Sequence, residues 1–259
     1  DVRPALAAAR YDEERLRADG CLAFEGVTRP PQCRYGVSNG AVTVALVGDS
    51  HAAQWFPAVE RIARVRGWQV RTFVKVACPF ADMRVANLAL KREYRECATW
   101  NLAVISELRA LQPDLVLISM SRFAIHPVLD RDATVGAQGA ALARFIDRLP
   151  GRVAVVVDTP EAGRDVPTCL ARNTGDVRAC AIPRSVAMSG DLGDRERIAA
   201  RLSGAGLIDL TTRICPLYPA PVVVDGRIVF RDTRHLTATF ARWLAPDLDA
   251  VIRRLVELT

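Results

Sequence analysis

Hydrophobic segments of two kinds alternate along the chain from residue 42 onward. The short ones are nearly continuous runs of Val, Leu and Ile, as expected for parallel strands that helices cover on both faces. The longer ones repeat their hydrophobic positions at the spacing of amphipathic helices. The predicted strands lie at 42–47, 69–74, 114–119, 152–157 and 206–210, and the predicted helices at 52–66, 88–111, 134–149, 185–202 and 236–258. This alternation implies right-handed crossovers and predicts an α/β fold, a three-layer sandwich around a mainly parallel sheet.

The beginning of the chain does not follow this pattern. Residues 4–17 have helical composition, and the Pro30-Pro31 break comes after them. We therefore predict an N-terminal extension or linker region at 1–38 and one α/β domain at 39–259. Near the other end, Asp225-Gly226 stands between two short hydrophobic runs, which predicts a small hairpin.

Composition and charge narrow the class of protein. The 259 residues carry a net charge of +6, half of them are hydrophobic, and no run approaches the ~20 apolar residues that span a bilayer. The chain starts at Asp1 without a basic and then apolar leader, so we expect any signal or membrane anchor to lie outside it. Apart from Lys75 and Lys91 the basic residues are arginines, and they are scattered, which argues against a nucleic-acid partner. A basic surface would suit an anionic glycan, but coding bias is the simpler explanation of the arginines. No phosphate-binding Gly-rich motif occurs, and we predict no cofactor.

The seven cysteines indicate disulfides rather than a metal site. No Cys-x-x-Cys occurs and no histidine is spaced near a cysteine, which argues against zinc. We predict three local disulfides from an oxidising compartment, each contributing about 2–3 kcal/mol: Cys21–Cys33, Cys78–Cys97 and Cys169–Cys180, the last within the long irregular stretch 160–184. Cys215 is left over, either as a buried thiol or because the connectivity differs. The alternative is a reduced cytosolic protein whose cysteines are small core residues.

Gly48-Asp49-Ser50-His51 directly follows the first predicted strand. In parallel α/β sheets, functional groups gather at the carboxyl ends of strands, where Ser50 falls. A hydroxyl at the start of a helix lies beside unpaired backbone N–H groups, which can stabilise an oxyanion. Ser50 is therefore a candidate nucleophile. The alternative is that Ser50 only caps the helix, a role that Asp49 shares.

Asp232-Thr233-Arg234-His235, before the last predicted helix, supplies the partners that such a serine needs. Asp232 and His235 are three residues apart, so one turn brings their side chains together. The carboxylate then fixes the imidazole tautomer while the other ring nitrogen faces the serine. The alternative is that Asp232 caps the final helix and His235 is a half-exposed residue of its first turn. We expect His51 to point away from the serine into the next turn, and His126 to have no partner.

These motifs resemble the SGNH (GDSL-like) hydrolase superfamily. More narrowly, the chain looks like the SGNH domains fused behind the membrane acyltransferase-3 domain in bacterial polysaccharide O-acetyltransferases. The resemblance runs from about residue 42 to the C-terminus and rests on Val47-Gly48-Asp49-Ser50-His51-Ala52, Cys78-Pro79, Pro113-Asp114-Leu115-Val116, and Asp225-Gly226 leading to Asp232-Thr233-Arg234-His235-Leu236-Thr237. It implies a flavodoxin-like five-stranded sheet, with Ser50 as nucleophile, His235 as general base and Asp232 as its orienter. The segment before residue 42 resembles the linker region that joins the membrane part to the SGNH part.

The chain departs from the superfamily pattern at two places. The Gly-x-Asn-Asp block after the third strand, which should supply an oxyanion-hole asparagine, is Ser119-Met120-Ser121-Arg122 here. The glycine expected after the second strand is not evident near Ala77-Cys78-Pro79. The amide of Ser50 remains one oxyanion donor, and Ser121 or Arg122 is a candidate for a second. An ordinary loop serine and a surface arginine are the alternatives.

We therefore expect a serine-dependent acyltransferase or carbohydrate esterase in the periplasm or another extracytoplasmic space, tethered to the inner membrane in a longer protein. The resemblance implies O-acetyl transfer to a bacterial cell-surface glycan through an acyl-serine intermediate. The partners would be a glycan acceptor, an acyl donor and a membrane-embedded acyltransferase domain. Two alternatives stay open. Water resolves the acyl-enzyme in a carbohydrate O-acetyl esterase, and a catalytically weak glycan-docking module would explain the missing asparagine.

Overall fold

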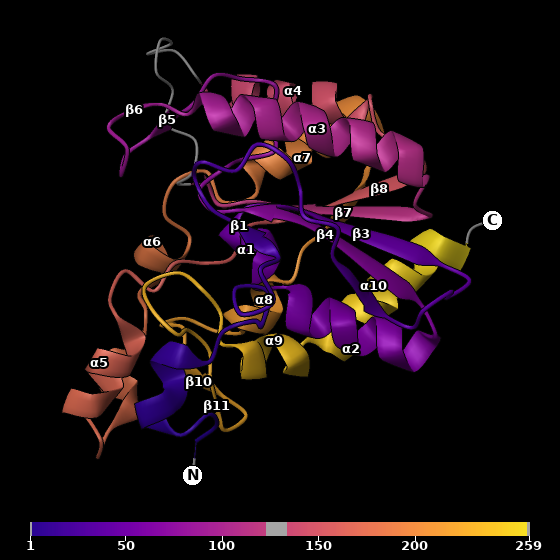
Figure 1. Cartoon of the computed structure of the whole chain (residues 1–259). Helices are drawn as coiled ribbons and strands as arrows, with labels where there is room; N and C mark the ends of the chain where they lie inside the picture. The colour runs from indigo at the N-terminus through magenta and orange to yellow at the C-terminus, as the bar shows by residue number, and fades with distance from the viewer. Residues whose placement is uncertain (1, 123–133, 258–259) are drawn as a thin grey trace.

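The centre of the molecule is one mainly parallel sheet (Figure 1). The computed structural model describes residues 2–122 and 134–257. Its sheet order is β1-β4-β3-β7-β8-β9, and each of these strands runs parallel to its neighbours. The bounds are β1 Leu22–Ala23, β4 Gln69–Lys75, β3 Thr43–Gly48, β7 Leu115–Ser119, β8 Arg152–Val156 and β9 Gly206–Ile208. All five predicted strands are confirmed, each with bounds close to those expected.

Helices cover both faces of this sheet, which confirms the three-layer sandwich (Figure 1). The helices on one face are α3 (Arg95–Leu111), α4 (Val135–Ile146) and α7 (Asp194–Ser203); those on the other are α2 (Phe56–Arg66), α8 (Thr211–Ile214), α9 (Ala238–Trp243) and α10 (Ala245–Glu257). Strand β3 contributes side chains to the hydrophobic cores on both faces of the sheet, because successive side chains of a strand point to opposite faces. Val44 and Leu46 belong to one hydrophobic cluster, whereas Ala45 and Val47 belong to the other.

The expectation of five strands is wrong, since the sheet of the described residues has seven. The two additional strands, β1 and β2 (Arg34–Gly36), come from the N-terminal extension, and both pair with β4. Strand β2 is antiparallel to β4, unlike the rest. Strand β1 pairs through only two residues, so the hydrophobic pattern carries no signal for it.

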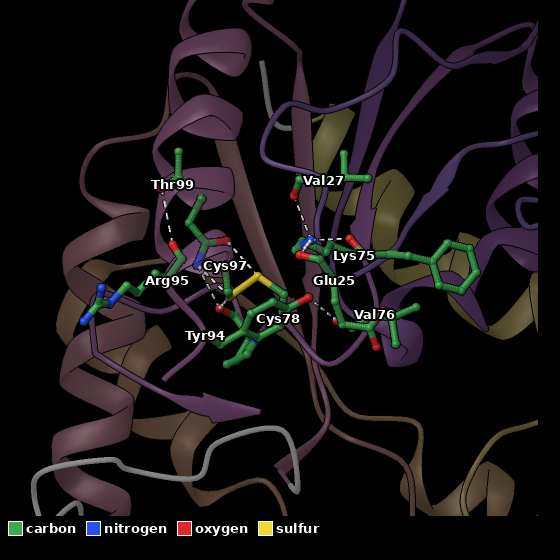
Figure 2. Close-up of a disulfide and its surroundings, with 12 residues drawn as sticks. Glu25, Val27, Lys75, Val76, Cys78, Tyr94, Arg95, Cys97 and Thr99 are labelled. Carbon is green, nitrogen blue, oxygen red and sulfur yellow. Dashed lines mark hydrogen bonds between the residues drawn. A yellow bond between two sulfur atoms is a disulfide. The ribbon is translucent and has the colours of Figure 1, made fainter. Parts of the chain in front are cut away.

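The buried Lys75 at the end of β4 holds this extension in place. Its Nζ donates hydrogen bonds to the carbonyl oxygens of Phe24, Glu25 (2.8 Å) and Val27 (2.7 Å) (Figure 2). The ring of Tyr94 lies 5.2 Å from the same Nζ. Burial lowers the pKa of Lys75 to about 8. One side chain thus ties three carbonyls of the extension to the edge of the sheet.

Three predicted helices differ from the observed ones. The segment predicted at 88–111 begins with a hairpin of β5 (Ala86–Asn87) and β6 (Arg92–Glu93), and only α3 is helical. The segment predicted at 185–202 splits into α6 (Arg184–Ala187) and α7, because Gly190 and Gly193 between them have φ values of 62° and 84°. The segment predicted at 52–66 divides into α1 (Ser50–Ala53) and α2.

The remaining elements lie in the second half of the chain and at its start. The predicted C-terminal helix is confirmed as two helices, α9 and α10. The stretch expected to be irregular at 160–184 contains α5 (Val166–Arg172) and the 3-10 helix η3 (Val177–Cys180). The hairpin at Asp225-Gly226 is confirmed as β10 (Val223–Val224) and β11 (Arg227–Ile228). A further 3-10 helix, η1 (Leu6–Tyr11), opens the chain.

Three disulfides are present with the predicted pairing: Cys21–Cys33, Cys78–Cys97 and Cys169–Cys180. Cys215 is a buried free thiol, and burial raises its pKa to about 12. Figure 2 shows the Cys78–Cys97 bond, which joins the loop after β4 to the first turn of α3. Within 2–122 and 134–257, no helix has both the length and the hydrophobicity needed to cross a membrane.

Candidate active site

Ser50 lies where β3 turns into α1, and Gly48 makes this turn possible. Gly48 has φ of 139°, and a Cβ built on it would lie 1.8 Å from the carbonyl oxygen of Ser119 on the neighbouring strand. Asp49 is the N-cap of α1, and its carboxylate accepts from the backbone amide of His51 at 2.8 Å. Because Asp49 caps the helix, Ser50 is not needed for capping, and its hydroxyl is available for another contact.

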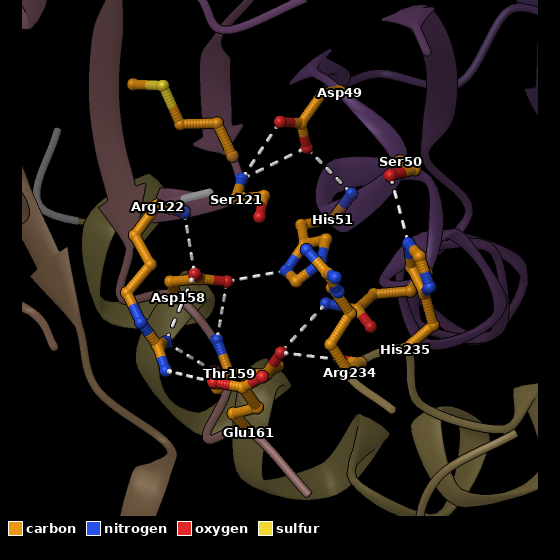
Figure 3. Close-up of polar contacts among 12 residues, drawn as sticks. Asp49, Ser50, His51, Ser121, Arg122, Asp158, Thr159, Glu161, Arg234 and His235 are labelled. Atoms are coloured by element: carbon orange, nitrogen blue, oxygen red, sulfur yellow. Dashed lines mark hydrogen bonds and ion pairs between the residues drawn. The ribbon is translucent and has the colours of Figure 1, made fainter. Parts of the chain in front are cut away.

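That contact is with His235, 185 residues further along the chain. His235 Nε2 lies 3.0 Å from Ser50 Oγ, and His235 Nδ1 lies 2.7 Å from Asp232 Oδ2 (Figure 3). Asp232 Oδ1 accepts from the backbone amides of Arg234 and His235, both at 2.8 Å. The N-cap of α9 is Thr237 and not Asp232. The structure therefore brings the three predicted residues together in the order serine, histidine, aspartate.

Opposing effects set the charges of this pair. Burial alone would raise the pKa of Asp232, but the hydrogen bond and positive charge of His235, together with two backbone amides, hold it well below its usual value. Burial lowers the pKa of His235, and its bond to Asp232 only partly offsets this. Asp232 is therefore ionised and His235 neutral near pH 7, so Nε2 can accept a proton.

The Ser50 hydroxyl opens into a cavity of about 370 Å³. Besides Asp49, His51 and the three residues above, its lining consists of Val76, Ala77, Ser121, Thr233 and Arg234. Ala77 has φ of 50°, a left-handed backbone conformation that favours glycine. The cavity wall after the second strand thus contains an alanine in a glycine-like backbone conformation.

The two candidates for the second oxyanion donor lie differently. Ser121 lines the cavity, and its backbone amide donates to both oxygens of Asp49, at 3.1 and 2.9 Å. The backbone amide of Arg122 donates to Asp158 at 2.8 Å, and its guanidinium donates to the carbonyl oxygen of Thr159 at 3.1 Å. Figure 3 shows Arg122 and Ser50 on opposite sides of His51. The structure brings Ser121 to the serine, but not Arg122.

The structure contains a second His–Asp pair that the sequence analysis missed. His51 Nδ1 lies 2.5 Å from Asp158 Oδ1, and both side chains are 1% exposed. His51 does point away from the serine hydroxyl, but its ring packs against that of His235, with the centroids 4.8 Å apart. Asp158 directly follows the predicted strand at 152–157. The rule that singled out Ser50, a polar residue at the carboxyl end of a parallel strand, could also have found Asp158.

Two other expectations concern histidine and metal. His126 lies outside the described residues. Among the residues that are described, no cluster of three or more His, Cys, Asp or Glu side chains is arranged to hold a metal ion.

A parallel sheet covered on both faces, with a serine, an imidazole and a carboxylate joined at its carboxyl edge, defines a class of α/β proteins. Within that class, the chain belongs to the family of SGNH domains fused to AT3 domains, whose family model matches residues 17–250. A solved structure of similar fold is the periplasmic domain of a lipopolysaccharide acetyltransferase from Salmonella ser. Paratyphi A. The TM-score is 0.70 at 16% identity, with 97% of this chain and 98% of that chain covered, so the likeness is one of fold. A search of curated proteins finds no match.

Proposed function

We propose that this domain transfers an acyl group, in the first place acetyl, to a hydroxyl of a bacterial cell-surface glycan through an acyl-enzyme on Ser50. The observation that carries the proposal is the continuous chain of short contacts from Ser50 Oγ through His235 to Asp232. In such a chain the neutral imidazole accepts the hydroxyl proton, and the ionised carboxylate stabilises the imidazolium that forms.

The proposed reaction has two half-reactions, and in each of them His235 Nε2 accepts a proton and then donates it. In the first, Ser50 Oγ attacks the acyl carbon while its proton passes to His235 Nε2, and the leaving group departs with that proton. In the second, the acceptor hydroxyl gives its proton to Nε2 and attacks the acyl carbon. The bond to Ser50 Oγ then breaks, and Oγ recovers the proton.

The oxyanion needs donors on the cavity wall. The amide of Ser50 is the first donor that we propose. Ser121, which lines the cavity, is the proposed second donor through its hydroxyl. Ala77 on the same wall is a further source of a backbone amide. The contacts of Arg122 with Asp158 and Thr159 favour a supporting role for its side chain instead.

Three features support an extracytoplasmic place for this reaction. The three disulfides suit an oxidising compartment. The family is defined by fusion to AT3 domains, and the similar structure is a periplasmic domain. We therefore propose that a membrane-embedded acyltransferase domain delivers the acyl group, and that the domain works on the periplasmic side, tethered to the inner membrane. The extension at 1–38 is the proposed linker toward that membrane domain.

The proposal is tested by turnover of p-nitrophenyl acetate and by mass spectrometry of the protein after reaction. We expect Ser50→Ala to lower kcat/KM by at least about 10³-fold, while the exposed Ser38→Ala leaves it unchanged. An added mass of one acetyl group should map to the peptide that contains Ser50. Equal turnover of wild type and Ser50→Ala would remove the nucleophile and leave the glycan-docking alternative.

The choice between transfer and hydrolysis needs an acceptor. With an oligosaccharide in the assay, acetylated sugar indicates a transferase, and acetate release that the sugar does not alter indicates an esterase. Exclusion of water from the acyl-enzyme decides between these outcomes.

A further inference from the structure

A second imidazole–carboxylate pair, His51 and Asp158, packs against the pair of His235 and Asp232 through the two imidazole rings. Asp158 Oδ1 contacts His51 Nδ1 at 2.5 Å and also accepts from the amide of Thr159 at 2.8 Å. Its Oδ2 accepts from the amide of Arg122 at 2.8 Å and from the Arg122 guanidinium at 3.4 Å. Four donors thus surround a carboxylate that is 1% exposed. A carboxylate held in this way is stabilised in its ionised form.

The charge of His51 follows from this partner. Burial alone would raise the pKa of Asp158, but His51 and the buried Arg195 outweigh it and lower the pKa to about 2. In return, although burial disfavours a charged imidazole, Asp158 and Asp49 together raise the pKa of His51 above its usual value. The contact with an ionised carboxylate thus favours the imidazolium form of His51. Its Nε2 is buried and has no hydrogen-bond partner among the described residues.

This imidazolium lies directly against the proposed base. The His51 and His235 rings meet edge to face, with centroids 4.8 Å apart and planes at 60°. The charged groups that act on His235 are Asp232 and Arg231 from its own loop, and His51 from α1. Arg234, from the same loop as His235, also acts on His51, with an effect opposite in sign to those of Asp49 and Asp158. Of the two cations named here, His51 lies in helix α1, whereas Arg231 lies in the loop that carries His235.

We propose that His51, held by Asp158, is a positioning residue for His235: its ring fixes the orientation of the His235 imidazole, and its positive charge keeps that imidazole in the neutral, proton-accepting form. This inference rests on the proposed function, because the neutral form matters only if His235 acts as a base. It gives a role to a buried pair whose carboxylate lies just after β8, far from α1 in sequence. The loops after β3 and β8 are thereby joined behind the base.

The decisive experiment compares His51→Asn with wild type. The asparagine amide can donate to Asp158 in place of Nδ1, so the hydrogen bond is kept while the charge and the ring are lost. We expect the acid limb of kcat/KM for p-nitrophenyl acetate to move up by about 0.5–2 pH units, the range of a Coulomb effect across the ring separation between the dielectric constant of water and that of a protein surface. The matched control is Arg71→Met, which removes a buried cation bound to the carbonyl oxygen of Cys33. It should lower stability and leave the acid limb in place.

NMR titration of the imidazole rings tests the same inference without an activity assay. In wild type, His51 should titrate at a higher pH than His235, and His235 should titrate at a higher pH in His51→Asn than in wild type. If His51 titrates below His235 in wild type, the inference is overturned even if no variant folds. An acid limb and a His235 titration that are unchanged in His51→Asn overturn it as well.

The two proposals fail in different ways. If Ser50→Ala turns over like wild type, the proposed function fails, whatever His51 does. If turnover depends on Ser50 but the acid limb of kcat/KM is the same in His51→Asn as in wild type, only the proposed role of His51 fails.

Discussion

The two His–Asp pairs of this domain contain the same side chains in opposite settings. His235 and Asp232 are three residues apart on one loop, and their side chains are 19% and 30% exposed. His51 and Asp158 come from segments 107 residues apart and are almost fully buried. The pKa of His235 lies below the usual value, mainly through burial, whereas Asp158 and Asp49 outweigh burial and raise the pKa of His51.

The difference teaches that residue type does not decide the charge of an imidazole. Each histidine has a carboxylate on Nδ1, so that contact alone cannot separate them. What differs is the rest of the surroundings of each ring. His235 has the hydroxyl of Ser50 on Nε2 and a neighbouring cation, while His51 has a second carboxylate, Asp49, acting on it. A neutral base and a charged support follow from these surroundings.

The largest effect should come from the exposed pair. Asp232→Asn keeps the shape of the side chain but removes the charge that orients and stabilises the imidazolium, so kcat should fall by about 10²–10⁴-fold. Stability should fall by less than on loss of a fully buried carboxylate, because the Asp232 side chain is 30% exposed. Steady-state kinetics and chemical denaturation of the same preparation measure both. Wild-type kcat in Asp232→Asn would remove this aspartate from the mechanism.

The buried pair should respond in the opposite way. Asp158→Ala leaves the His51 charge buried and unpaired, which typically costs about 3–5 kcal/mol in the free energy of unfolding. Asp232→Ala is the matched control and should cost much less, since its side chain is partly exposed. Urea unfolding with a shared m-value measures the difference. Equal losses in the two variants would contradict the distinction between the pairs.

The contrast between the pairs also marks how far sequence reasoning reaches. Ser50, Asp232 and His235 could be predicted because each stands in a short motif next to a strong strand or helix pattern, and the topology of parallel sheets brings strand ends together. The five strands were equally visible as continuous hydrophobic runs. The separation of Asp232 and His235 is local, so one turn suffices to pair them.

The parts that could not be predicted depend on contacts between distant segments. Asp158 carries no motif of its own, and only the fold places it beside His51. Strand β1 is two residues long, and a buried lysine far along the chain helps to hold it. The breaks within predicted helices depend on single positions such as Gly193, whose φ is positive. The periodicity of hydrophobic residues reveals long segments, but it does not reveal distant contacts, very short strands or single backbone positions.

A third buried charge, Lys75, sharpens the comparison, since its contacts within the described residues are with carbonyl oxygens and not with a carboxylate. Lys75→Met removes the cation and one donor from each of three carbonyl oxygens, of which that of Phe24 still accepts from the amide of Val27 at 3.1 Å, and it creates no unpaired charge. We expect a loss of about 1–3 kcal/mol in the free energy of unfolding, smaller than that of Asp158→Ala. Limited proteolysis should show earlier cleavage within the extension. A loss as large as that of Asp158→Ala would mean that any buried polar group, paired or not, has this effect.

The smallest effect is the pH dependence of stability, where the two histidines should act with opposite sign. His235 has a lowered pKa, so the unfolded chain binds more protons just below pH 6.5, and stability falls as the pH falls through that value. His51 has a raised pKa, so its contribution to stability is complete below pH 6.5 and is lost as the pH rises through the pKa of His51 in the folded state.

Relative to wild type, His235→Gln should therefore lose the decline in stability on the acid side, and His51→Asn should lose the decline in stability on the alkaline side. Each amounts to about 1.4 kcal/mol per unit of pKa shift. Urea unfolding at intervals between pH 5 and 8 measures both slopes. Lys75 is present in wild type and in both variants, so its own pH dependence cancels when each variant is compared with wild type. Slopes of the same sign in the two variants would show that the pairs do not differ in charge.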